Sequence, residues 1–146
     1  MELIQKIIHA LTQVHPPHLM VVHFPVGLTG GALFFLILAI IYKKEIFEKI
    51  AFANISLAAL STIVAAGVGI RDNIHFYNGL AANHVTKIIL ASTLFLITTL
   101  TAYARWKNPD LFHKTTAKVF YRLAYFVSFG IAIVLGFLGG VIVYGF

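Results

Sequence analysis

Residues 15–42 have the sequence HPPHLMVVHFPVGLTGGALFFLILAIIY. After the histidines and prolines at its start, residues 19–42 contain no Asp, Glu, Lys or Arg. A helix needs about 20 predominantly apolar residues to cross the ~30 Å hydrocarbon core of a bilayer. The stretch therefore predicts a membrane-spanning helix, which the chain enters through a proline-rich bend.

Three further apolar segments occupy residues 51–70, 85–104 and 120–146. The 146-residue chain is 60% hydrophobic and only 11% charged, whereas soluble domains have roughly 25% charged residues. Its mean hydropathy is +0.90. Because the apolar runs are continuous, they favour helices over the alternating strands of a membrane barrel. We predict an all-α fold in which residues 1–146 form one domain, an integral membrane four-helix bundle with spans at 19–42, 51–70, 85–104 and 120–146.

The N-terminal stretch MELIQKIIHALTQV has apolar residues at helical spacing. A secretory signal has a continuous apolar core instead. The pattern is typical of a short amphipathic helix that lies on the membrane surface.

The chain contains no cysteine, which excludes disulfides, thiolate metal sites, iron–sulfur clusters and covalently attached haem. A cofactor would therefore be held by histidine, by carboxylate or by packing. No nucleophile elbow, phosphate loop or HExxH motif is present in the sequence. We expect a non-catalytic electron carrier or a subunit rather than a stand-alone enzyme.

Lysine and arginine residues in the connections predict the orientation of the bundle. The first and third connections carry most of them, and positively charged connections face the cytoplasm. We therefore predict a bacterial inner-membrane protein whose N and C termini both face the periplasm. Of the seven histidines, all but His113 then lie at or near the periplasmic face. These histidines are His9, His15, His18, His23, His75 and His84.

The clustered histidines are candidate ligands for a b-type haem in a cytochrome b-like electron carrier. Two imidazoles must approach the haem iron from opposite faces, so they must come from different helices. The helix face that carries His23 also carries Gly27, Gly30 and Gly31, and glycine leaves room for a flat group or for a neighbouring helix. His84 begins a different span. His23 and His84 are therefore the expected axial ligands of haem b.

Other residues near the same membrane face complete the expected haem site. These cofactor-binding candidates are His15, His18, His75, Arg71 and Lys87. His15 or His18 would pair with His75 as a second set of ligands, and the two cations would neutralise the haem propionates. Asp72, three residues before His75, would orient an imidazole by a hydrogen bond.

Two other functions are compatible with the sequence. A copper or zinc ion would use His15, His18, His23 and His84 as ligands. The H-x2-H spacing favours such a small ion, whereas the glycine face has no role beside one. A structural subunit without a cofactor would use its small-residue faces for packing.

The expected partners are the lipid bilayer and either a larger redox complex or further copies of the chain. The net charge of +6 is carried mainly by short connections between apolar runs. We interpret these charges as topology signals rather than as a nucleic-acid-binding surface.

The stretch HPPHLMVVHFPVGL resembles the signature H-P-x-H-P-x-x-V-H-F-P-I-x-L of a large family of bacterial predicted membrane proteins, a domain of unknown function. The matching positions are His15, Pro16, His18, His23, Phe24 and Pro25. A glycine and an aspartate close the second span of that family and a histidine opens the third, as Gly69, Asp72 and His84 do here. Leu19 departs from the family's second His-Pro pair, and His75 has no counterpart. The resemblance implies the four-span fold and this set of histidines.

Overall fold

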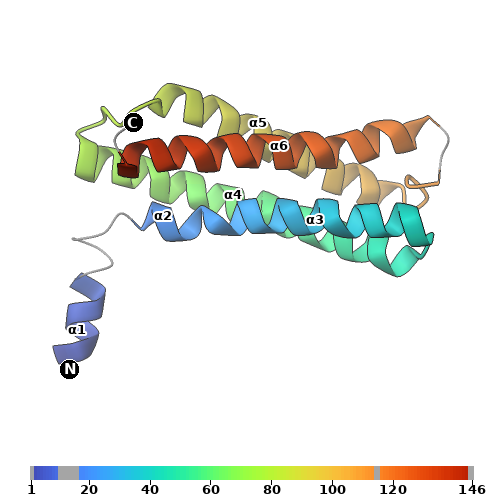
Figure 1. Cartoon of the computed structure of the whole chain (residues 1–146), viewed down its shortest axis with the longest axis horizontal. Helices are drawn as coiled ribbons and strands as arrows, with labels where there is room; N and C mark the ends of the chain where they lie inside the picture. Colours follow the sequence, from blue (N-terminus) through green and yellow to red (C-terminus); the bar gives the residue numbers. More distant parts are fainter. Residues whose placement is uncertain (1, 10–16, 114–115, 145–146) are drawn as a thin grey trace.

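The computed structural model describes residues 2–9, 17–113 and 116–144 of the chain, and all regular secondary structure in these residues is helical (Figure 1). The helices are α1 (Glu2–His9), α2 (His18–Val21), α3 (His23–Tyr42), α4 (Glu45–Tyr77), α5 (His84–Lys107) and α6 (Ala117–Tyr144). Segments long and apolar enough to cross a membrane are His18–Tyr42, Glu45–Tyr77, His84–Lys107 and Ala117–Val141. The prediction of an all-α fold with four membrane-spanning helices is confirmed.

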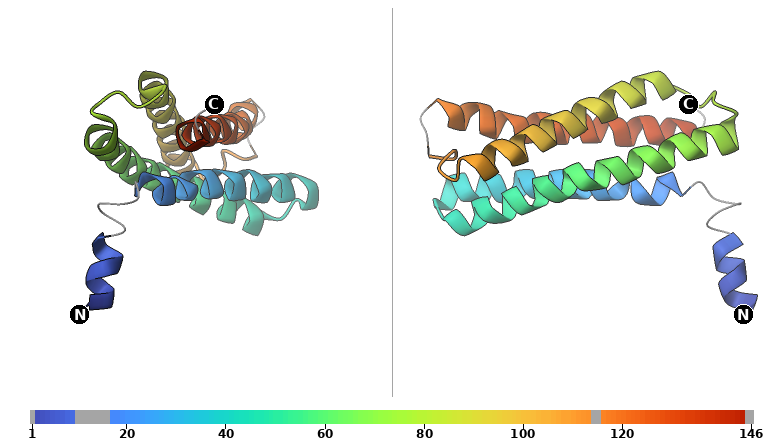
Figure 2. Two further views of the ribbon diagram at one scale, coloured as in Figure 1. Left: turned by 60° about the vertical axis from the view of Figure 1, so that its left-hand side comes forward. Right: turned by 180° about the vertical axis from the view of Figure 1, so that it is seen from behind.

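The four long helices form an antiparallel bundle. Helix α3 packs against α4 and α6, and α5 packs against the same two helices. In Figures 1 and 2, α3 and α4 lie side by side and α5 and α6 lie across from them. One end of the bundle carries α2, the α4–α5 connection and the last turns of α6 (Figure 1). We call it the α2 end, and the other end carries the α3–α4 and α5–α6 connections.

Helices α2 and α3 form one nearly continuous span. Val22 N donates to His18 O at 2.9 Å, and the chain turns helical again at His23. Pro25 lies in the first turn of α3, where its missing N–H is not needed for the helix. The span therefore begins at His18 rather than at residue 19.

Helix α4 is longer than the predicted span of residues 51–70. It begins at Glu45 because Glu45 and Glu48 in its first turn are favoured by the helix dipole. It ends at Tyr77, where Asn78 adopts a left-handed conformation and Gly79 N donates to Asn73 O at 2.9 Å. With 33 residues, α4 is about 50 Å long at ~1.5 Å per residue. His75, expected in a loop, therefore lies on a helix.

The glycine face of α3 is used for helix packing. A methyl group added at Gly30 would lie 3.0 Å from the Phe129 ring of α6, and one added at Gly31 would lie 3.2 Å from Asn54 Oδ1 of α4. Gly27 is exposed, with no described atom within 4 Å of such a methyl. Of the two uses expected for this face, the structure shows packing of neighbouring helices at Gly30 and Gly31, so no flat group fits beside these two glycines.

Helix α1 carries its apolar side chains on one face. Leu3, Ile4, Ile7 and Ile8 are all exposed, and their spacing places them together on one side of the helix. The amphipathic character of α1 is confirmed, and its position on the membrane surface stays a prediction.

A buried polar cluster, which the sequence did not indicate, joins three helices at the end of the bundle opposite the α2 end. The Glu48 carboxylate, 3% exposed, accepts hydrogen bonds from Arg105 Nε at 2.6 Å and Arg105 Nη2 at 2.7 Å. The Tyr121 hydroxyl donates to Glu48 Oε1 at 2.8 Å and lies 2.7 Å from the Tyr125 hydroxyl. We call these four residues the Glu48 cluster. It connects α4, α5 and α6.

Candidate functional site

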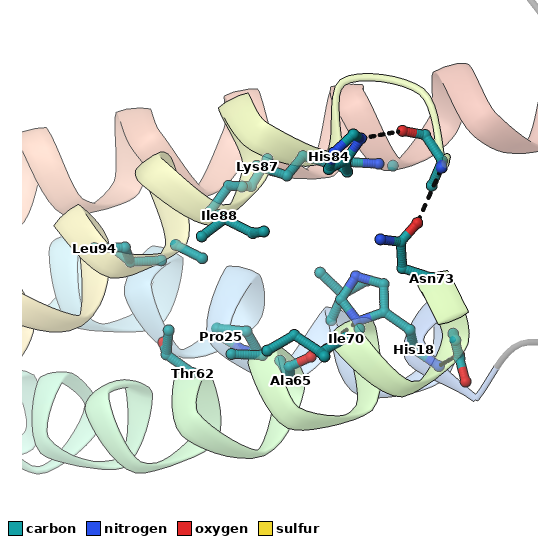
Figure 3. Close-up of a pocket in the computed structure, with 18 of the residues that line it drawn as sticks. His18, Pro25, Thr62, Ala65, Ile70, Asn73, His84, Lys87, Ile88 and Leu94 are labelled. Atoms are coloured by element: carbon teal, nitrogen blue, oxygen red, sulfur yellow. Dashed lines mark hydrogen bonds between the residues drawn. The ribbon is translucent and has the colours of Figure 1, made fainter. Parts of the chain in front are cut away.

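A cavity of about 380 Å³ lies near the α2 end, between the four long helices (Figure 3). Its size is within the range of small-molecule sites. Most of the wall is apolar, with side chains from α2, α3, α4, α5 and α6. The polar lining residues are His18, Thr62, Asp72, Asn73, Tyr77, His84, Lys87 and Ser92.

His18, the first residue of α2, is held against α4 by three contacts. Its backbone N–H donates to Asp72 Oδ2 at 2.8 Å, so a carboxylate of α4 caps the start of the first span. Its imidazole Nδ1 lies 3.0 Å from the backbone oxygen of Ala65. The ring packs over Gly69, where an added methyl would lie 3.0 Å from two of its atoms. The structure thus fixes both the backbone and the ring of His18.

The contact with Ala65 determines which imidazole nitrogen of His18 is available. A carbonyl oxygen only accepts hydrogen bonds, so Nδ1 carries the proton and donates. In the neutral ring Nε2 then has a free lone pair. Histidines that bind metal centres use this arrangement, in which one ring N–H is bonded to a carbonyl or carboxylate and the other nitrogen is the ligand.

His84, the first residue of α5, has the same arrangement. Its Nδ1 lies 3.0 Å from Ala81 O, and its ring is half-buried at the cavity wall (Figure 3). The loop that holds Ala81 is itself fixed, because Ala81 N donates to Asn73 Oδ1 of α4 at 2.9 Å. His18 and His84 therefore line one cavity from different helices, each with Nδ1 bonded to a backbone oxygen.

Lys87 follows His84 by one helical turn and also lines the cavity (Figure 3). It is half-buried, and its ammonium group has no hydrogen-bond or ion-pair partner among the residues that the structure describes. Arg71, the other cation expected near a propionate, is exposed, pairs with Asp72 Oδ1 at 3.2 Å, and is not part of the cavity wall.

The other predicted ligands lie elsewhere. His23 is exposed on α3 and does not line the cavity. The face of the first span that lines the cavity carries His18, Val22 and Pro25. Each residue turns the helix by about 100°. His23 is therefore rotated away from that face, so the expected pairing of His23 with His84 is not formed.

His75 is exposed on α4, with its ring edge-on to Phe76 at 4.8 Å between centroids, and does not line the cavity. Asp72, expected to orient an imidazole, instead accepts the backbone N–H of His18. His15 lies outside the described residues. Within 2–9, 17–113 and 116–144, no group of three or more His, Asp or Glu side chains is placed to hold a metal ion.

Sequence reasoning missed the role of the backbone oxygens of Ala65 and Ala81 and of the Asn73 amide. Nothing in the sequence pattern marks a carbonyl that an imidazole from another helix will reach. Gly69 and Asp72, however, are three residues apart on α4 and so share one face. Both contact His18, which is the physical reason for a glycine and an aspartate at the end of this span.

Gly69→Ala is expected to lower the thermal unfolding midpoint, because its methyl group would displace the His18 imidazole. Overpacking of this kind costs about 1–3 kcal/mol. Gly67→Ala is the matched control, since no described atom lies within 4 Å of the added methyl and alanine favours a helix by about 0.5–1 kcal/mol over glycine. Circular dichroism melts in one detergent compare the two variants. Equal midpoints would show that the imidazole is not held against Gly69.

Comparison with known proteins identifies the chain at the level of its family. No curated protein and no solved structure matches it. Residues 14–146 match the family described as Predicted membrane protein (DUF2231). This match covers nearly the whole chain, from the histidine-rich entrance of the first span through all four spans. The chain therefore belongs to the family of predicted membrane proteins DUF2231.

Proposed function

We propose that this membrane protein binds b-type haem in the cavity, where His18 and His84 would hold the haem iron, and that it transfers electrons. One observation supports this above all. Two imidazoles on different helices line a single, mostly apolar cavity, and each has Nδ1 bonded to a backbone oxygen, which leaves Nε2 as the ligating atom. Bound haem would supply a one-electron redox centre. The protein would supply its ligands and an apolar environment.

The charges around the cavity also suit haem. Lys87 lines the wall without an acidic partner in the described part of the chain, so its ammonium group is available to a propionate. The apolar wall would keep water from bound haem and strengthen the interaction of Lys87 with a propionate.

A copper or zinc ion has less support in the geometry. Such ions take three or four protein ligands, whereas the cavity offers two imidazoles. Asp72 is the acidic residue among those that line the cavity, and its carboxylate is already bonded to His18 N and Arg71. Two imidazoles on separate helices would suffice to hold a haem iron.

We place the protein in the bacterial inner membrane, with the cavity toward the periplasm, as a subunit of a redox complex or as a homo-oligomer. The placement follows from the charge distribution. Lys43 and Lys44 connect α3 to α4, and Arg105 and Lys107 lie at the end of α5. All four lie at the end opposite the α2 end, and cationic connections face the cytoplasm.

Visible spectra of protein purified from a haem-replete host test the proposal. We expect a Soret band in the oxidised protein and sharp α and β bands after reduction with dithionite, as two histidine ligands produce. Haem content should approach one per chain. Colourless protein, or stoichiometric copper or zinc without haem, would contradict the proposal.

A further inference from the structure

The cavity is polar toward the α2 end and mostly apolar deeper in the bundle. Asn73 lies near the end of α4 and Lys87 lies in the first turn of α5, so both are close to the α2 end (Figure 3). The lining side chains nearer the middle of the bundle are mostly apolar, and they include Pro25, Ile63, Ala66, Leu94 and Phe95. A ligand that fits this cavity therefore carries its polar groups at one end.

Asn73 offers a hydrogen-bond donor to such a ligand. Its Oδ1 accepts from Ala81 N at 2.9 Å, and this contact assigns the other atom of the amide as Nδ2. The Nδ2 group points into the cavity (Figure 3) and has no hydrogen-bond partner within residues 2–9, 17–113 and 116–144. An amide nitrogen only donates, so a ligand beside Asn73 must supply an acceptor.

Lys87 adds a positive charge from α5, whereas Asn73 comes from α4. Asp72, the acidic residue of the cavity lining, does not compete for this charge, because its carboxylate is bonded to His18 N and Arg71. The ammonium group of Lys87 and the amide nitrogen of Asn73 both act as donors only. Charged and neutral N–H donors of this kind suit a carboxylate.

We propose that Asn73 Nδ2 and Lys87 Nζ bind the two propionate carboxylates of haem at the α2 end of the cavity. This proposal rests on the proposed function and adds Asn73 as a positioning residue, in the place that the sequence suggested for Arg71. Both carboxylates of the porphyrin are on one edge of its ring, and the rest of the ring is apolar. The two donors therefore decide which end of the cavity receives that edge. Binding of the carboxylates does not require iron.

Titration of haem-free, full-length protein in detergent micelles tests the role of Lys87. The probes are metal-free protoporphyrin IX, followed by its fluorescence, and its dimethyl ester, which has the same ring without carboxylates. We expect Lys87→Met to weaken binding of the diacid about 10-fold, the loss of one charge-assisted hydrogen bond, and to leave binding of the ester unchanged. Lys107→Met, exposed at the other end of α5, is the control and should change neither affinity. Each porphyrin is compared between variants, so its partition into the micelle cancels.

Asn73→Asp tests the amide donor. Aspartate keeps an oxygen that accepts from Ala81 N and replaces the Nδ2 donor with a second carboxylate oxygen. Repulsion between like charges should weaken binding of the diacid about 10-fold and leave binding of the ester unchanged. Circular dichroism checks that both variants fold, and if one of them does not, the other decides.

The outcomes separate this proposal from the proposed function. Absence of saturable diacid binding by the wild type would overturn the propionate contacts, and so would variants that weaken the diacid and the ester equally or weaken neither. If the wild type nevertheless binds hemin through histidine, the haem site stands and only the contacts of Asn73 and Lys87 are rejected. Selective loss of the diacid, in a protein whose hemin spectrum lacks histidine ligation, would leave the carboxylate contacts standing and reject the proposed haem site.

Discussion

Arg105→Met is expected to lower the free energy of unfolding by about 3–5 kcal/mol, the cost of leaving a buried carboxylate without its partner. The Glu48 side chain is 3% exposed, and its two strongest hydrogen bonds come from Arg105, which is itself 12% exposed. Methionine keeps an unbranched apolar stem and removes the guanidinium, together with the contact of its carbon with the Phe52 ring at 5.6 Å from the centroid. Equilibrium unfolding in mixed micelles, followed by far-ultraviolet circular dichroism, measures the effect.

The exposed pair Glu45–Lys49 provides the control on α4, the helix that carries Glu48. Its atoms are 4.0 Å apart and both side chains are more than half exposed, so Lys49→Met should change stability by at most about 0.5 kcal/mol. The double variant Glu48→Gln with Arg105→Met should recover part of the loss, because no buried charge is then left unpaired. A shift as small for Arg105→Met as for Lys49→Met would show that the Glu48 cluster does not hold the helices together.

His18→Ala and His84→Ala are each expected to reduce haem affinity by more than the 10- to 100-fold that loss of a residue supporting a metal ligand produces. Each removes one of the two imidazoles on the cavity wall. Titration of haem-free protein with hemin, followed at the Soret band, gives the affinity of each variant. Added imidazole should partly restore the spectrum of His84→Ala, since the cavity would then admit a free ligand.

His23→Ala and His75→Ala are the matched controls, because both residues are exposed and neither lines the cavity. Their spectra and affinities should equal those of the wild type. Loss of haem in His23→Ala with retention in His18→Ala would reject the assignment of His18. It would restore the pairing of His23 with His84 that the sequence alone favoured.

The four spans could be predicted from the sequence because hydropathy is a property of consecutive residues. A run such as 19–42, without a formal charge, must be helical in lipid to satisfy its own backbone hydrogen bonds. The ends of the helices were predicted less well. Glu45 and Asn78 extend α4 through dipole and capping effects, which a hydropathy pattern does not include.

The set of histidines near one end of the bundle, with Gly69 and Asp72 beside them, was also accessible from the sequence. Which of these histidines line the cavity could not be predicted from the sequence. Whether His18 or His23 faces the cavity depends on the rotation of the first span about its axis, which is set by packing of Gly30 and Gly31 against α6 and α4.

Pairings between distant parts of the chain were decided only by the tertiary structure. Glu48 and Arg105 are 57 residues apart, and His18 meets the backbone oxygen of Ala65 across 47 residues. Composition and periodicity describe each helix separately, so they determine that a helix spans the membrane and which of its residues share a face. Only the contacts between helices decide which face turns inward, and therefore which two imidazoles share the cavity.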